Sequence, residues 1–400
     1  MNEEPKKKHK ILGILVRSIL LIAITATITY FVTVNITINQ YLNKANSEYM
    51  KAKMSLVKTK LEKTYIRDLN EDDMIEGAIS GYVSGVGDKY TQYLTKDDMQ
   101  KLMEATTGNY VGIGVYMVTS TDANAVVIVG VMEDSPAEKA GIKDGDIIVK
   151  VDDESYIGKK SEDVSNAIKG QEGTNVKVTV MRESQELEFN ITRKSIKVKT
   201  VASQMLDNNI GYIKIASFDV GTANEFRDNY NKLKENNPKA LILDLRNNGG
   251  GVVAEALSIA DTMVEKGKVL LITTDKDGKE KVDKASQKPI IDVPVVILVN
   301  ENTASASEIL SGTLRDDCGY KIIGTNTYGK GVIQSIFTFK DGTGVKVTTN
   351  EYFSPNHNVI NDVGIKPDIE IELDAEWKGY STIPFENDKQ LQKAIEELNK

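Results

Sequence analysis

Three segments of the chain carry side chains that could act together as a nucleophile, a base and an oxyanion site. Asn302–Glu308 places serines where a buried strand is expected to end and a helix to begin. A hydroxyl there would lie beside unpaired N–H groups at the positive end of the helix, which can hold an oxyanion. Thr327–Gln334 places Lys330 between two glycines, and burial could lower its pKa enough for it to act as a base. Asp244–Gly251 ends in glycines whose N–H groups can approach a carbonyl closely.

Simpler interpretations of the same residues remain open at this point. Thr303 or Ser305 could be only a helix N-cap, Lys330 a solvated turn residue, and the triple glycine a helix entry. Gly324–Lys330 fits the first part of a phosphate-binding loop. However, a glycine stands where a magnesium-binding Ser or Thr should follow, and the next segment is strand-like.

The composition excludes most other catalytic classes. Two histidines and the single cysteine Cys318 are too few for a multi-histidine metal centre, a cysteine-rich zinc site or a disulfide framework. A histidine-dependent triad would have to use His357 in a loop, because His9 is expected on the other side of a membrane. A serine–lysine site requires no metal or organic cofactor. The net charge of −8 argues against nucleic acid as a partner.

The segments around these residues predict an α/β domain. Apolar, β-branched runs indicate strands at 210–216, 239–245, 293–300 and 320–323. Helices are expected at about 253–266, ended by Gly267, and at 305–316, and strands 332–340 and 345–353 flank a hairpin turn at 341–344. The three candidate segments each follow a strand, at the edge where open α/β sheets bind ligands.

The N-terminal region is expected to be a membrane anchor. Residues 1–17 form a basic tail, and no charged residue occurs between Ser18 and Asn43. A transmembrane helix over 18–40 would contact membrane lipid and match the hydrocarbon thickness. The lysines before it predict a single-pass cell membrane protein with a cytoplasmic N-terminus and an extracytoplasmic remainder. A cleaved signal peptide and a buried core helix are the alternatives.

Residues 41–105 read mostly as helix, and the β-rich region 106–194 resembles a PDZ domain. In that family, a carboxylate-binding loop stands where this chain has Gly112, Ile113, Gly114 and Val115. Consecutive N–H groups in such a loop form a nest for a terminal carboxylate, and the next strand edge can accept a peptide. The alternative is a purely structural β module, because glycines also mark tight turns.

The catalytic segments resemble those of the carboxyl-terminal processing peptidases, also called tail-specific proteases. The resemblance extends from about Tyr65 to the C-terminus. It rests on Ser-Ala-Ser-Glu followed by Gly-Lys-Gly-x-x-Gln, with the serine and lysine 25 residues apart, and on four further segments: 85–93, 244–250, 352–355 and 364–368. It implies that Ser305 is the nucleophile, Lys330 the general base and Gln334 its orienting partner. On a strand, residues four apart project from the same face.

The same resemblance implies oxyanion donors and a domain plan. The donors would be the N–H of Ala306 and that of Gly249 or Gly250. Residues 195–360 would form a core of the ClpP/crotonase type, followed by a C-terminal segment, 361–400. The PDZ domain would capture the C-termini of substrates and could gate the site. Thr303 departs from the family pattern, where many members have serine.

These expectations combine into one function and one alternative. The function is a membrane-anchored serine endopeptidase that cleaves exported or membrane proteins near apolar C-terminal tails. The alternative is a catalytically silent, PDZ-containing peptide-binding scaffold at the membrane. The N-terminal helices and Gln390–Leu398 could support a homodimer.

Overall fold

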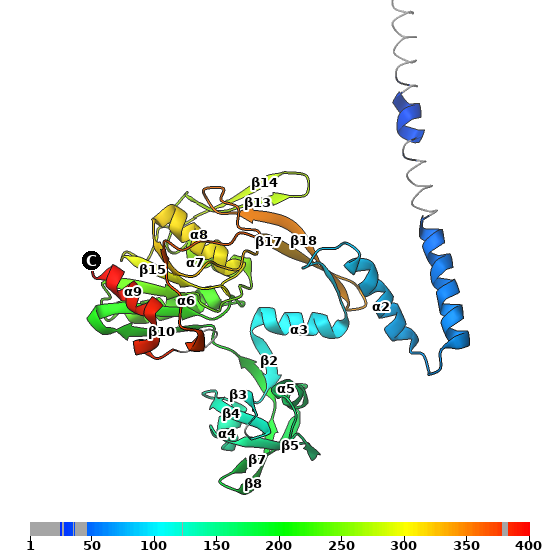
Figure 1. The fold of residues 1–400 in the computed structure, drawn as a ribbon, viewed down its shortest axis with the longest axis horizontal. Coiled ribbons are helices and arrows are strands. Elements are labelled where there is room, and N and C mark those ends of the chain that lie inside the picture. The colour runs from blue at the N-terminus through cyan, green and yellow to red at the C-terminus, as the bar shows by residue number, and fades with distance from the viewer. Residues whose placement is uncertain (1–24, 26–27, 35, 37–45, 122, 378–382) are drawn as a thin grey trace, which may run out of the picture. The chain divides into compact units, whose positions relative to one another are not determined.

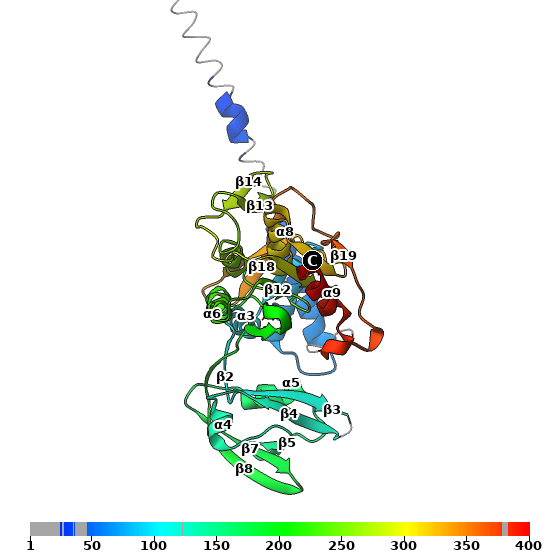
Figure 2. The same ribbon diagram turned by 90° about the vertical axis from the view of Figure 1, so that its left-hand side faces the viewer.

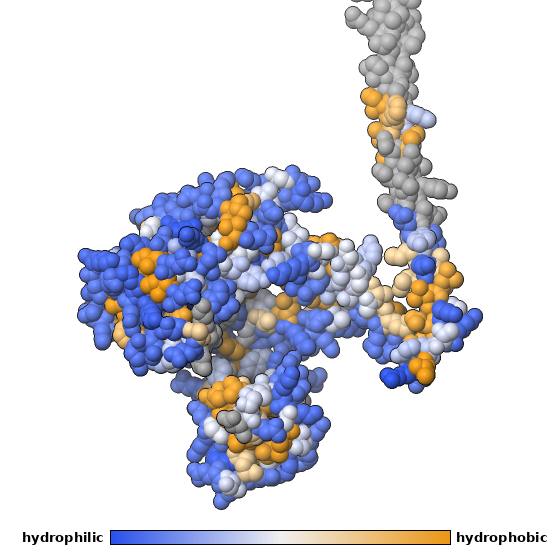
Figure 3. All heavy atoms as spheres, viewed as in Figure 1, coloured by the Kyte–Doolittle hydropathy of each residue, from blue (hydrophilic) through white to orange (hydrophobic). Residues whose placement is uncertain are grey.

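The structure, a computed structural model, describes residues 25, 28–34, 36, 46–121, 123–377 and 383–400 of the 400-residue chain. It divides into two compact units, Met1–Ala78 and Ile79–Lys400, which are considered separately (Figure 1). In the first unit the described residues are helical over 28–34 and 46–64, and α2 (Glu71–Ser84) begins there. Apolar side chains such as Met54 and Leu56 are exposed on helix 46–64 (Figure 3).

The expected membrane-spanning segment, 18–40, lies largely outside the described residues, and the basic tail 1–17 lies wholly outside them. Within the described part of the chain, no helix combines the length and the hydropathy needed to cross a membrane.

The centre of the second unit is a six-stranded sheet in the order β10-β11-β12-β15-β16-β19. All neighbours pair in parallel except β10, which runs antiparallel to β11 at one edge. The loops after β12, β15 and β16 therefore meet at one edge of the sheet, as the sequence predicted. The strands are β10 (Val201–Leu206), β11 (Ile210–Ile215), β12 (Ala240–Asp244), β15 (Val295–Val299), β16 (Lys321–Gly324) and β19 (Ile369–Glu370).

Helices cover both faces of this sheet, which explains why β12 and β15 are buried along their whole length and, apart from Asp244 at the end of β12, apolar. α6 (Thr222–Lys234), α7 (Val253–Ala260) and α8 (Ala306–Cys318) share the core on one face. α9 (Lys389–Leu398) packs Leu391 and Ala394 against the other. Three 3₁₀ turns complete this part: Asp207–Asn209, Ala375–Trp377 and Phe385–Asn387.

The prediction that the helix from Val253 continues to Lys266 is wrong, because α7 ends at Ala260. The Asp261 carboxylate accepts a hydrogen bond from the N–H of Ser286 at 2.6 Å, and the N–H of Gly267 donates to the Ala285 carbonyl at 2.8 Å. These contacts with a distant segment turn the chain early and direct it into β13.

A second sheet of the same unit has the order β1-β18-β13-β14, with β17 paired to β18. The expected β17–β18 hairpin is confirmed. β1, β13 and β14 were not predicted from the sequence, and both β1 and β13 pair with the distant strand β18. The strands are β1 (Gln92–Leu94), β13 (Val269–Asp275), β14 (Glu280–Lys284), β17 (Val332–Thr338) and β18 (Gly344–Phe353).

The β-rich region forms a module with its own apolar core. Its main sheet has the order β3-β4-β5-β7-β8, with the short β6 beside β5, and α5 packs along the edge strand β3 (Figure 2). The ribbon β2–β9 connects the module to the rest of the unit, and α3 (Lys96–Thr107), capped by Thr95, precedes it. The elements are β2 (Asn109–Gly112), β3 (Val115–Ser120), β4 (Ala125–Val131), α4 (Pro136–Ala140), β5 (Ile147–Val151), β6 (Glu154–Ser155), α5 (Ser161–Ile168), β7 (Asn175–Arg182), β8 (Gln185–Thr192) and β9 (Lys194–Lys197).

Candidate active site

Ser305 occupies a strained turn between the loop after β15 and the start of α8. Its φ of 57° and ψ of −117° are unusual for a residue with a side chain, and such conformations cost on the order of 1–3 kcal/mol. The residue is 8% exposed, and the N–H of Ala306 opens the helix directly after it. The turn therefore places a hydroxyl next to an N–H group at the positive end of a helix.

The buried carboxylate of Glu308 connects this turn to the loop after β16, which carries Lys330. Its Oε2 accepts hydrogen bonds from the main-chain N–H groups of Ser305 (2.8 Å) and Lys330 (2.9 Å). Its Oε1 accepts from the N–H of Gly329 (2.7 Å) and the hydroxyl of Thr327 (2.6 Å). Because one oxygen serves both Ser305 and Lys330, the main chains of these residues are held side by side.

Tyr352, at the end of β18, makes a second connection between the same two residues. Its buried hydroxyl is within hydrogen-bonding distance of the Ser305 carbonyl, at 3.1 Å, and of the Lys330 carbonyl. Burial raises the pKa of Tyr352 well above its usual value, so the hydroxyl keeps its proton. Glu308 accepts from the N–H groups of both residues while Tyr352 contacts both carbonyls.

Asn248 brings the glycine-rich loop after β12 to the turn that carries Ser305. Its side-chain NH₂ donates to the carbonyl at the end of β11. Its main-chain carbonyl accepts from the N–H of Ala304 (3.0 Å) and from the hydroxyl of Ser307 (3.0 Å). Gly250 then passes so close that a Cβ on it would lie 2.8 Å from the Cβ of Ser305. Its φ of +99° also requires glycine.

The two candidate glycine donors differ in their hydrogen bonds. The N–H of Gly250 donates to Asn248 Oδ1 at 2.9 Å. In the described part of the chain, the N–H groups of Gly249 and Ala306 have no acceptor. Gly249 is also exposed, with open space where a Cβ would stand.

Lys330 has the environment expected of a lysine whose amine loses its proton easily. Burial lowers its pKa below 10.5, and the nearby charge of Lys346 lowers it further. Three groups oppose this by favouring the charged form: Tyr328, Asp88 and Glu308. Among the described residues, no hydrogen bond joins Nζ of Lys330 to the Ser305 hydroxyl, and Nζ lies 4.6 Å from the centroid of the Tyr90 ring.

Glycines on both sides of Lys330 let the segment after β18 approach. A Cβ at Gly331 would lie 2.3 Å from the N atom of Asn361, whose side chain accepts from the Gly331 N–H at 3.1 Å. Gln334 does not continue a regular strand from Lys330, because β17 begins at Val332 and its register shifts between Ile333 and Gln334. Its amide donates to Thr348 on β18 at 3.3 Å, and its role as orienting partner stays a prediction.

Comparisons with known proteins identify two domains and the family of this chain. The profile of “Peptidase family S41” matches residues 209–371, and that of “PDZ domain” matches 127–182. The carboxy-terminal processing protease CtpA of Bacillus subtilis (strain 168) is 33% identical over 369 residues, which cover 92% of this chain and 78% of that one. The chain belongs to peptidase family S41.

A second relative agrees with the assignment to S41, and a solved structure shares the fold. A CtpA-like serine protease of Staphylococcus haemolyticus (strain JCSC1435) is 36% identical over 91% of this chain and 73% of its own. A crystal structure of a Bacteroides fragilis NCTC 9343 protein assigned to the S41 proteases has the same fold, with a TM-score of 0.54, 16% identity and coverage of 84% and 91%. This S41 peptidase is therefore a hydrolase of the serine type and groups with the carboxy-terminal processing proteases.

The PDZ domain of this S41 peptidase has a groove of about 450 Å³ between β3 and α5. Ile113 and Ile168 are buried in its wall, and Lys169 lies at the end of α5. The N–H groups of Ile113 and Gly114 have no acceptor among the described residues, and Gly114 has a φ of +82°. Because β3 is an edge strand, a peptide could pair with it.

Sequence reasoning assigned no role to Glu308, Tyr352 or Tyr90, although all three lie in segments that carried the family resemblance. A glutamate three residues after the helix start usually indicates a capping box, in which its carboxylate binds one N–H group. That pattern could have indicated the Glu308 contact with Ser305. It could not have indicated the contacts with Gly329 and Lys330, which depend on the fold.

Proposed function

We propose that this S41 peptidase is a Ser–Lys endopeptidase that cleaves exported or membrane proteins near apolar C-terminal tails. The observation that carries the proposal is the shared carboxylate of Glu308, which fixes the main chains of Ser305 and Lys330 against each other. A lysine side chain is long and flexible enough to reach a neighbouring hydroxyl from such a position. Its lowered pKa supports a role as a neutral base.

In the proposed reaction, the neutral amine of Lys330 takes the proton of the Ser305 hydroxyl as Oγ attacks the peptide carbonyl. The ammonium then gives the proton to the leaving amine, and an acyl-enzyme remains on Ser305. A water molecule, deprotonated by the same amine, hydrolyses the ester and restores both side chains. Gln334 would orient the lysine once it turns toward the serine.

The oxyanion would accept hydrogen bonds from the N–H groups of Ala306 and Gly249. This choice between the two glycines follows from the bond that the Gly250 N–H already makes to Asn248. Gly250 then has a different role, in which its missing side chain lets the loop approach Ser305. Each oxyanion donor contributes on the order of 10²–10³ in rate in serine proteases.

The PDZ groove is proposed to hold the substrate tail. The free N–H groups of Ile113 and Gly114 would bind the terminal carboxylate, with Gly112 and Val115 flanking them, and the apolar wall would take the last side chain. A membrane anchor over 18–40, an extracytoplasmic catalytic part and a homodimer remain part of the proposal from the sequence.

The test is covalent labelling by a serine-directed phosphonate, together with cleavage of a peptide with an apolar C-terminus. Ser305→Ala should abolish both, and Lys330→Ala should reduce both by about 10²–10⁴, the usual contribution of a general base. Ser258→Ala and Lys340→Ala change the same residue types at exposed positions and should match wild type. Cleavage by Ser305→Ala at the wild-type rate would refute the assignment, and absence of labelling in wild type would favour the silent scaffold.

A further inference from the structure

A short segment before β1, residues 88–91, lies against the catalytic lysine. The segment is anchored to β18: the hydroxyl of Thr91 donates to Asp88 and accepts from the N–H of Thr348 at 3.0 Å. β1 then pairs directly with β18. Tyr90 is therefore held by the same strand whose end carries Tyr352, and its position relative to Lys330 is fixed by the fold.

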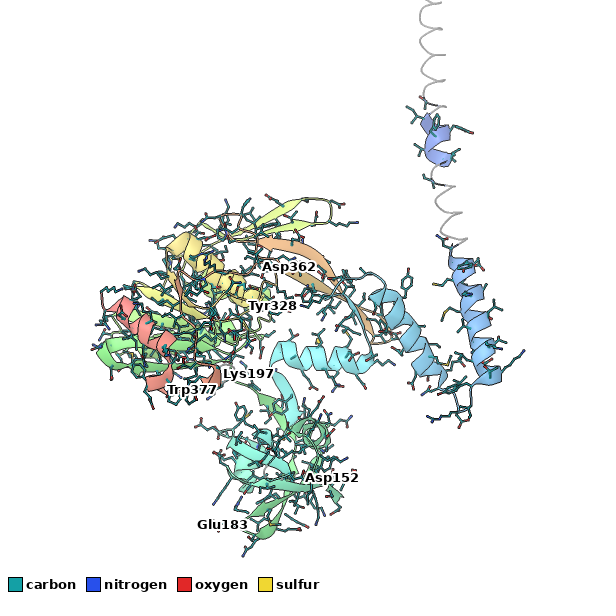
Figure 4. The ribbon with its side chains drawn as sticks, in the orientation of Figure 1. Asp152, Glu183, Lys197, Tyr328, Asp362 and Trp377 are labelled. Carbon is teal, nitrogen blue, oxygen red and sulfur yellow. The ribbon has the colours of Figure 1, made fainter. Side chains whose placement is uncertain are left out.

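The ring of Tyr90 forms part of a cluster of aromatic rings and cations. Nζ of Lys330 lies 4.6 Å from its centroid, and Nζ of Lys89 lies 5.3 Å from the same centroid. Lys89 also donates to the hydroxyl of Tyr328 and lies 4.9 Å from that ring. Figure 4 labels Tyr328, and the loop that bears it leads directly into Lys330.

A cation and a neutral amine interact differently with such a ring. The negative face of an aromatic ring attracts an ammonium group, but a neutral amine carries no net charge to be attracted. Protonated Lys330 therefore gains from the contact with Tyr90, whereas the neutral form, which the reaction needs, does not. Loss of the proton weakens the contact at the moment when the amine becomes able to accept one from Ser305.

We propose that Tyr90 is a positioning residue that holds the protonated Lys330 side chain over its ring and releases the neutral amine toward Ser305. The proposal rests on the Ser–Lys mechanism above and adds to it a link between the charge of the base and its location. It also gives a role to the 85–93 segment, which the proposed mechanism does not otherwise use.

Other charged and titratable groups around Lys330 are the same in each variant of Tyr90. Lys346 on β18 lowers the pKa of Lys330, while Asp88, Glu308 and Tyr328 raise it. Lys89 adds a positive charge on the same aromatic cluster. The Tyr90 hydroxyl also interacts with Lys89 and Tyr328, so only a change that occurs in Tyr90→Leu and is absent from Tyr90→Phe is attributable to the ring face.

The experiment measures the rate of phosphonate labelling of Ser305 against pH in the full chain. Tyr90→Leu keeps an apolar cover but removes the ring face, so the pH at half-maximal labelling should fall by about 0.5–1 unit. Tyr90→Phe keeps the face and should retain the wild-type midpoint. A fluorinated phenylalanine at position 90 keeps the shape of the ring but reduces the negative charge on its face. It should lower the midpoint as Tyr90→Leu does, and it provides the test even if the leucine variant folds poorly.

A purely structural role for Tyr90 would lower the labelling rate in these variants without moving the midpoint. An unmoved midpoint in both Tyr90→Leu and the fluorinated variant would overturn the proposal, as would an equal shift in Tyr90→Phe. Lys330→Met distinguishes failure of the proposed role of Tyr90 from failure of the Ser–Lys mechanism. If that variant keeps the wild-type titration, the Ser–Lys mechanism fails; if it loses the titration while Tyr90→Leu leaves the midpoint unmoved, only the role of Tyr90 fails.

Discussion

The substitution Glu308→Gln tests whether one buried carboxylate holds the proposed catalytic residues, Ser305 and Lys330, together. Glu308 is fully buried and accepts four hydrogen bonds, two at each oxygen. Glutamine has the same shape but presents an NH₂ group to two of these donors. Each buried donor left unpaired costs about 1–3 kcal/mol, so the free energy of unfolding should fall by about 2–6 kcal/mol. The separation of Ser305 from Lys330 should also increase, and a misplacement of about 1 Å can reduce kcat by about 100-fold.

Urea unfolding and kcat with a tail peptide measure the two effects in the same samples. Glu301→Gln is the matched control, because this nearby glutamate is exposed and, among the described residues, accepts one hydrogen bond, from the Thr325 hydroxyl at 2.9 Å. It should change stability by less than about 0.5 kcal/mol and leave kcat within two-fold of wild type. If Glu308→Gln behaves like this control in both measurements, the reasoning from the shared carboxylate is wrong.

Three further substitutions, one of them with a matched control, test other parts of the structure. Gly250→Ala should reduce kcat by about 100-fold or more, because its Cβ would lie 2.8 Å from the Ala304 carbonyl oxygen. Gly249→Ala is the control: its Cβ would meet no atom within 4 Å, so kcat should fall by less than about ten-fold in the same peptidase assay. Asp388→Asn weakens the buried ion pair of Asp388 with Arg246 (2.8 Å), and urea unfolding should show a free energy of unfolding lower by about 1–3 kcal/mol. A decrease of less than about 0.5 kcal/mol would contradict a structural role for this contact. Gly114→Ala places a Cβ 2.5 Å from the Cβ of Ser135 and should displace the loop, so fluorescence anisotropy should show at least about ten-fold weaker binding of a tail peptide. Unchanged binding would place the carboxylate site elsewhere.

The sequence could predict the parallel sheet and its active-site edge because the relevant signals are local. β15 is a continuous apolar run and β12 is apolar up to Asp244, and the candidate segments begin at or shortly after the ends of β12, β15 and β16. Ser305 and Lys330 were predicted to act together from their residue types, their place after strands and the family resemblance. The structure brings their main chains together, as that prediction requires.

The sequence could not predict contacts that depend on packing between distant segments. β1 and β18 are about 250 residues apart, so nothing near Tyr90 indicates that it lies over Lys330. The early end of α7 depends on hydrogen bonds from Ser286, and the alternation expected from Lys330 to Gln334 is interrupted by the register shift in β17. Such shifts depend on the partner strand rather than on local residue preference.

The central claim is that a neutral Lys330 activates Ser305, and the most direct measurement is the labelling rate of Ser305 from pH 5 to pH 11 in wild type and Lys330→Met. The lowered pKa predicts that the wild-type rate rises with pH and reaches half its maximum below pH 10.5. Lys330→Met should lose this rise and label about 100-fold more slowly or worse. If the variant keeps the same rise with pH and stays within ten-fold of the wild-type rate, Lys330 is not the base.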